Sequence, residues 1–133
     1  MRDQSWNHPD SLWPGAVPGQ RFTDRIDPWE ISSSELKQRL DRGDPVVLLD
    51  VRETWEADAA SLPGARLIPL RELDYRAEDE LDRDEEIVVV SHHGVRSMEA
   101  AMTLWNWGFD RVKNLSGGID RWAEMIDPDM PRY

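Results

Sequence analysis

The sequence predicts a single α/β domain with a mainly parallel central sheet, and three observations support that prediction. Apolar runs rich in β-branched residues, at 46–49 and 87–90, are typical of strands buried on both faces of a parallel sheet. Helical patterns alternate with such runs, which requires crossover connections that cover the sheet. The length of 133 residues suits one domain with one core. We therefore expect three layers, with about five strands between helices on both faces.

The expected strands and helices follow residue 28 and are separated by glycines and prolines that interrupt regular secondary structure. Serines at 32–34 are good N-cap residues for the first helix, which closes at Gly43. The dipeptide Pro63-Gly64 marks a turn, and Pro128 stops the last helix. In chain order, strands are expected at 29–31, 46–49, 66–68, 87–90 and 112–115, and helices at 35–40, 98–108 and 119–126.

One helix shows a clear apolar stripe. Met98, Ala101, Met102 and Trp105 recur at the spacing i, i+3, i+4 and i+7. We expect this stripe to pack in the core, as we do for Trp122 in the last helix.

Residues 1–28 form a separate segment in the sequence. Four prolines and two glycines exclude long helices and central strands there, so an N-terminal arm is expected before a domain at 29–133. Trp6, Trp13 and Phe22 make the arm too apolar for a purely disordered tail, and we expect it to lie across its own domain.

Composition excludes several classes of partner. A net charge of −11 opposes binding to nucleic acid or to an anionic membrane. No run approaches the roughly 20 apolar residues that span a bilayer, and the first residues lack the pattern of a signal peptide. A cytoplasmic protein is expected. The absence of cysteine excludes disulfides, thiolate metal sites and a cysteine nucleophile.

The polar loop after the run at 87–90 is the candidate site, because parallel sheets bind ligands beyond the carboxyl ends of their strands. A short loop that enters a helix directs several backbone N–H groups to one point, where the helix dipole favours an anion. Arg96 can brace this loop or neutralise a bound charge. The expected anion cradle comprises Ser91, His92, His93, Gly94, Val95, Arg96 and Ser97.

This loop resembles the active-site loop of the rhodanese (sulfurtransferase) family, in which a nucleophile is followed by four residues and an arginine. Other segments match the family's motifs in the same order. They are Asp50-Val51-Arg52-Glu53 with Glu56, Pro63-Gly64-Ala65 with Ile68-Pro69, Gly108-Phe109 before Val112, and Asn114-Leu115-Ser116-Gly117-Gly118-Ile119 with Trp122. The resemblance implies a rhodanese-like fold and the transfer of a sulfane sulfur, without a cofactor, from thiosulfate or a persulfide donor to a thiophilic acceptor. The implied partners are a small sulfur-containing anion or a thiol or persulfide protein.

Two features depart from the family. Ala60-Ser61 stands where Gly-His usually precedes the Pro-Gly turn. More importantly, Ser91 stands where the family has the cysteine that carries sulfur as a persulfide. A helix N-terminus can lower a thiol pKa from about 8.5 into the range of about 3.5 to 7.5, whereas a hydroxyl there stays protonated. Oxygen forms no stable counterpart of a persulfide, so we expect no sulfur transfer.

Two interpretations follow from Ser91. The chain is a sulfurtransferase domain whose cysteine was replaced, in evolution or deliberately, or it is a non-catalytic module that binds an anion or a partner protein. The sequence does not separate them.

Hydrolase and phosphatase chemistry are disfavoured. For a serine hydrolase, His92 or His93 would have to reach back to Ser91, and no orienting carboxylate is indicated. Phosphatase and arsenate-reductase loops of related folds hold five residues between nucleophile and arginine, which makes a wider cradle than the four here.

No metal site is expected, because only His8 adds to His92 and His93 and no thiol is present. The paired histidines are expected to shape the rim of the loop. Asp50 closes a buried strand and should accept local hydrogen bonds, which makes Asp50 and Arg52 supporting residues. Arg52 and Glu56 are expected to pair on a helix.

Overall fold

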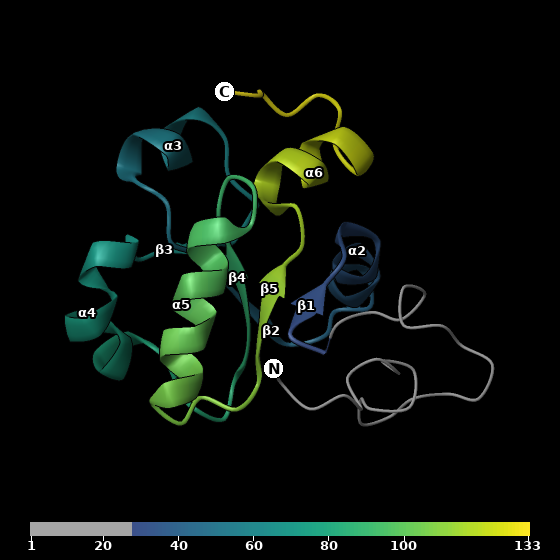
Figure 1. Ribbon diagram of the computed structural model, residues 1–133. Coiled ribbons are helices and arrows are strands. Elements are labelled where there is room, and N and C mark those ends of the chain that lie inside the picture. The colour runs from purple at the N-terminus through teal and green to yellow at the C-terminus, as the bar shows by residue number, and fades with distance from the viewer. Residues whose placement is uncertain (1–27) are drawn as a thin grey trace, which may run out of the picture.

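Five parallel strands form the centre of the molecule in the computed structural model, which describes residues 28–133 (Figure 1). Their order across the sheet is β1-β5-β4-β2-β3, and every strand pair in the described part of the chain is parallel. The strands are β1 (Glu30–Ile31), β2 (Val46–Asp50), β3 (Arg66–Leu67), β4 (Glu86–Val90) and β5 (Val112–Leu115). The predicted fold class is confirmed.

The two apolar runs form the central strand pair, as predicted. They lie side by side in register from Val46 opposite Glu86 to Asp50 opposite Val90. Every residue from 87 to 90 is at most 1% exposed. Burial is less complete at the start of β2, where Val46 and Val47 line an open hollow and are only half-buried.

Helices cover both faces of the sheet (Figure 1). One core cluster packs β1 and the sheet against α2 and α6, and the other packs the sheet against α4 and α5. The helices are α2 (Ser33–Asp41), α3 (Thr54–Ala59), η3 (Leu70–Glu72, a 3-10 turn), α4 (Leu73–Glu80), α5 (Val95–Asn106) and α6 (Gly118–Met125). The expected N-cap is present, since Ser32 Oγ accepts the N–H of Glu35 at 3.0 Å.

The predicted core stripe of α5 was wrong in part. Met102 is 53% exposed and Met98 and Trp105 are half-buried, whereas Ala100 and Ala101 are fully buried. Small side chains face the sheet because they let the helix lie close to the strands, and the larger apolar residues sit at the edges of that face. Trp122 is buried at 5% exposure, as expected.

The predicted arm at 1–28, with Trp6, Trp13 and Phe22, lies outside the described residues apart from Pro28. Between residues 28 and 133, no helix has both the length and the apolar character needed to cross a membrane.

Candidate functional site

The candidate loop connects β4 to α5 and lies beside α6 at the carboxyl ends of the strands (Figure 1). Gly94 ends the loop with a φ of +98°, in the left-handed region. A Cβ at this position would lie 3.3 Å from the backbone nitrogen of Gly117 and 3.4 Å from the carbonyl oxygen of Leu115. The left-handed backbone conformation therefore favours glycine, and a side chain here would also be tight against the chain after β5.

Ser91 lies at the floor of the loop and is 1% exposed. Its Oγ accepts the backbone N–H groups of Gly94 and Ser97, each at 3.1 Å. It also lies 2.8 Å from Ser97 Oγ, and Ser97 donates its own proton to Asn114 Oδ1. Because Ser97 has only one hydroxyl proton, the Ser91 hydroxyl is the donor to Ser97.

Asn114 fixes the direction of this hydrogen-bond chain. Its side-chain nitrogen donates to the carbonyl oxygen of Gly94 at 3.1 Å and to Glu30 at 3.3 Å, so its oxygen faces Ser97. The chain therefore runs from Ser91 through Ser97 to Asn114. Neither neighbouring histidine takes part in it, which leaves Ser91 without a general base among residues 28–133 and disfavours serine-hydrolase chemistry further.

Four further backbone donors lie in the segment that follows Ser91. The N–H groups of His92, His93, Val95 and Arg96 have no hydrogen-bond partner within residues 28–133. Two of them belong to the first turn of α5, where N–H groups have no intrahelical acceptor. This arrangement is able to accept an anion.

Arg96 forms a two-point ion pair with Glu56 of α3. Its two terminal nitrogens donate to the two carboxylate oxygens, each at 2.7 Å. Glu56 is 3% exposed and also accepts the Tyr133 hydroxyl at 3.0 Å and the N–H of Glu53 at 2.9 Å. The ion pair with Arg96, aided by these two donors, lowers the pKa of Glu56 to about 2. Arg96 thus ties the loop to α3, and its expected roles of bracing the loop or neutralising a bound charge stay predictions.

Asp50 and Arg52 form a second, deeper ion pair. Arg52 is 0% exposed and donates to the two oxygens of Asp50 at 2.9 and 2.6 Å, so Asp50 accepts local hydrogen bonds as predicted. Arg52 also donates to the carbonyl oxygen of Ala60 at 2.7 Å. The expected Arg52–Glu56 pair was wrong. Arg52 precedes α3 and reaches only the backbone oxygen of Glu56, at 3.3 Å.

Three rings stack beside the loop, and a fourth meets the stack edge-on. His93 stacks on His92 with centroids 3.9 Å apart, and His92 stacks on Tyr133 at 4.2 Å. Trp55 meets the edge of Tyr133 at 5.7 Å. The Tyr133 hydroxyl accepts from Arg52 at 2.7 Å and thus joins the two ion pairs through one side chain. Burial lowers the pKa of His92 from its usual value.

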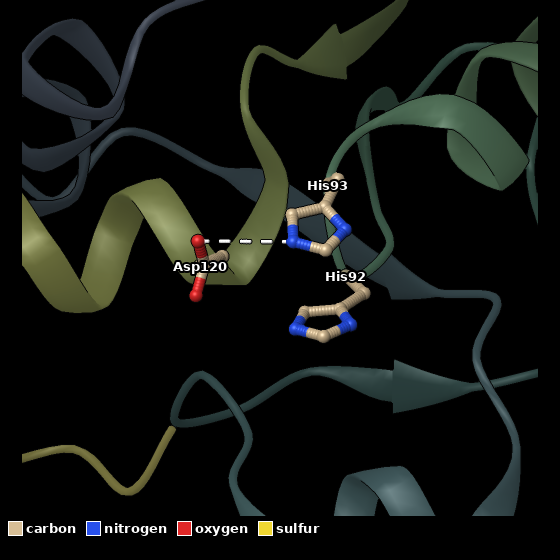
Figure 2. Close-up of side chains that lie close together, drawn as sticks. All are labelled: His92, His93 and Asp120. Atoms are coloured by element: carbon tan, nitrogen blue, oxygen red, sulfur yellow. Dashed lines mark ion pairs between the residues drawn. The ribbon is translucent and has the colours of Figure 1, made fainter. Parts of the chain in front are cut away.

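The start of α6 is hydrogen-bonded to the loop. The N–H groups of Ile119 and Asp120 donate to the carbonyl oxygens of Ser91 and His92 at 2.9 and 3.0 Å. A Cβ on Gly118 would lie 2.4 Å from both of these oxygens, so only glycine fits. The contact brings Asp120 Oδ2 to 3.8 Å from His93 Nε2 (Figure 2).

Sequence reasoning identified the loop but missed Tyr133, Asp120 and the Glu56–Arg96 pair as parts of the site. The one signal for Tyr133 is that the ending Asp127-Pro128 with Pro131-Arg132-Tyr133 resembles small single-domain members of the family. Asp120 lies in a predicted helix, directly after a motif that does resemble the family.

Comparisons with known proteins agree with this architecture. The family profile described as "Rhodanese-like domain" matches residues 32–125. A Bacillus subtilis protein with the provisional name of sulfur carrier protein YrkF is 41% identical over 94 residues, which cover 71% of this chain and 50% of that protein. An Allochromatium vinosum protein named sulfurtransferase is 36% identical over 94 residues, covering 71% of this chain and 87% of that protein.

Solved structures give the same result. A rhodanese-related protein from Thermoplasma volcanium superposes with a TM-score of 0.65 at 30% identity, covering 71% of this chain and 90% of that one. A rhodanese-like domain from Anabaena gives a TM-score of 0.69 at 27% identity, covering 76% of each chain. The chain spans half or less of the length of several curated relatives. One example is a rhodanese-like/PpiC domain-containing chloroplast protein from Arabidopsis thaliana, which is 39% identical over 93 residues. That match covers 68% of this chain and 31% of the relative.

Proposed function

The chain belongs to the rhodanese-like domain family, and from that premise we propose that it is a sulfurtransferase-type domain whose cradle holds a small anion but forms no persulfide. Names of relatives, a sulfur carrier and a sulfurtransferase, support the reaction class. The candidate ligand is thiosulfate or a similar sulfur-containing anion. A thiol or persulfide protein is the other candidate partner, and a cytoplasmic location remains a prediction.

One observation supports this proposal above the others. Ser91 Oγ lies where the N–H groups of Gly94 and Ser97 converge at the start of α5. A thiolate at this point would be stabilised by both donors and by the helix dipole. The serine hydroxyl instead gives its proton to Ser97 and faces no base, so it is neither an anion nor an activated nucleophile.

A cysteine at position 91 would supply the missing step. Its thiolate would attack the sulfane sulfur of thiosulfate, the S–S bond would break, and sulfite would leave with the electron pair. Cyanide would then attack the outer sulfur of the persulfide, releasing thiocyanate and restoring the thiolate. The four N–H groups after Ser91 that have no partner among residues 28–133 could hold the anion during both steps.

The test compares the parent chain, Ser91→Cys and Ser61→Cys in a thiosulfate and cyanide assay. Ser61 is exposed and distant in sequence from the loop, so its cysteine variant controls for the chemistry of any surface thiol. We expect thiocyanate formation above background from Ser91→Cys alone. A folded Ser91→Cys protein that stays inactive with thiosulfate and with persulfide donors would contradict the proposal.

One observation favours a second candidate, a non-catalytic docking module. Trp55, which packs against Tyr133 beside the loop, is 64% exposed, and Val95 at the end of the loop is 77% exposed. Exposed large apolar residues near a site are typical of protein interfaces. An inactive Ser91→Cys protein would make this the better interpretation.

A further inference from the structure

Three side chains with metal-binding atoms meet where the loop contacts α6. One ligand atom from each of His92, His93 and Asp120 lies within 4.8 Å of the other two. Figure 2 shows a nitrogen of each imidazole on the side of the ring that faces the carboxylate. The sequence suggested no such set, because a count of histidines and cysteines overlooks an aspartate contributed by a distant helix.

The backbone fixes the relative positions of these groups before any ligand binds. The N–H of Asp120 donates to the carbonyl oxygen of His92 at 3.0 Å, and that of Ile119 donates to Ser91 at 2.9 Å. Gly118 permits the contact because any side chain there would collide with both carbonyls. A site on such rigid anchors loses little conformational entropy on binding.

We propose that His92, His93 and Asp120 bind a divalent transition-metal ion of the zinc class. Two imidazoles and one carboxylate are ligands that Zn²⁺ accepts, whereas Mg²⁺ and Ca²⁺ prefer sites made of oxygen ligands alone. Three protein ligands leave a fourth tetrahedral position open to water or a small anion.

Metal binding requires the three ligand atoms, which lie within 4.8 Å of one another, to move closer together. Tetrahedral Zn²⁺ with bonds of about 2.0–2.2 Å places ligand atoms about 3.3–3.5 Å apart. His93 Nε2 and Asp120 Oδ2 are already 3.8 Å apart, and the His93 side chain is 63% exposed and has room to turn. The two rings are stacked at an angle of 22°, so His93 must tilt away from His92 for both lone pairs to converge on one ion.

Arg132 binds the other oxygen of the Asp120 carboxylate. It donates to Asp120 Oδ1 at 2.8 Å, while Oδ2 faces His93. An outer hydrogen bond of this kind orients a ligating carboxylate and leaves its other oxygen for the ion. The ion therefore replaces the His93–Asp120 ion pair and not the Arg132 contact.

The experiment titrates the untagged full chain with Zn²⁺ by calorimetry and with Co²⁺ by visible absorption. The parent chain contains no cysteine, so no thiolate competes for the metal. We expect one ion per chain, and we expect His93→Gln and Asp120→Asn each to weaken binding by about tenfold or more. His8→Gln, which changes the one remaining histidine, is the matched control and should bind as the parent does.

Several results would overturn the proposal. They are the absence of Zn²⁺ binding below about 100 μM, unchanged binding in both His93→Gln and Asp120→Asn, or loss of binding in His8→Gln. Circular dichroism and thermal unfolding of each variant separate loss of a ligand from loss of the fold. His93→Gln is the decisive variant because its side chain is mostly exposed. Sulfur transfer by Ser91→Cys is a separate measurement, so failure here leaves the proposed function intact.

Discussion

Arg96 and Glu56 lie 40 residues apart, yet their side chains form a two-point ion pair that ties the loop to α3. Because Glu56 is almost completely buried, this pair couples the stability of the domain to pH.

The first prediction concerns that coupling. Folding lowers the pKa of Glu56 from 4.5 to about 2, so its contribution to stability is complete above pH 4.5 and is lost as pH falls toward 2. A shift of this size corresponds to about 3 kcal/mol. Urea unfolding between pH 6 and 2 should show a fall in the free energy of unfolding, and in Glu56→Gln this fall should be smaller by up to about 3 kcal/mol, because other paired carboxyls such as Glu86 still contribute. Glu78→Gln, which changes an exposed partner of Arg83, should retain the full fall.

The second prediction concerns anion binding. Arg96→Ala removes the brace of the loop, and the N–H groups of the cradle should lose their alignment. We expect the affinity for sulfate or thiosulfate to fall by about tenfold, the equivalent of one charge-assisted hydrogen bond. Arg71→Ala, which removes an exposed arginine paired with Glu53, should leave affinity unchanged. Equal affinities of Arg96→Ala and the parent would show that Arg96 does not support the cradle.

The third prediction concerns Tyr133. Tyr133→Phe keeps the ring on His92 but removes the hydroxyl that links Arg52 and Glu56, and it should cost about 1–2 kcal/mol of unfolding free energy. Tyr133→Ala should cost more because it also removes the stacked ring. Tyr75→Phe, at an exposed position, should be neutral. Equal stability of Tyr133→Phe and the parent would mean that the hydroxyl makes no net contribution.

The fourth prediction concerns Gly118. It and Gly64 both have positive φ, +63° and +80°, but a Cβ meets backbone oxygens only at Gly118. Alanine at either position should cost about 1–2 kcal/mol for the left-handed backbone. Gly118→Ala should cost at least about 2 kcal/mol more, since the loop and α6 must separate. Similar unfolding midpoints for the two variants would contradict the predicted collision.

The sequence predicted the strands better than the helices. Unbroken apolar runs such as 87–90 have few alternatives to a buried parallel strand. By contrast, α4 was not predicted, and a helix near α3 was implied only by the expected pairing of Arg52 with Glu56. In α4 only Leu73 and Ala77 are buried, and the surrounding acidic residues are typical of a solvated surface. So few apolar positions give too weak a periodicity for a helix to be recognised.

In the candidate site, features that depend on adjacent residues were predicted, whereas contacts between residues far apart in the sequence were not. The loop at 91–96 was predictable because a strand, a polar segment and a helix follow one another in the sequence. The partner of Arg96 was not, because side-chain pairing between residues 56 and 96 leaves no local pattern. Tyr133 and Asp120 reach the loop only through the tertiary fold.

The hydrogen bonds from Ile119 and Asp120 to the loop carbonyls also make the shape of the loop depend on α6. While a nascent chain still lacks α6, the carbonyls of Ser91 and His92 have only water to accept from, even if β4 and α5 have already docked. The candidate loop is then held only by the strand and the helix that flank it, β4 and α5. Its final shape therefore requires α6 to be in place, so the geometry of the site depends on a helix that comes later in the chain than the strand and the helix that flank the loop.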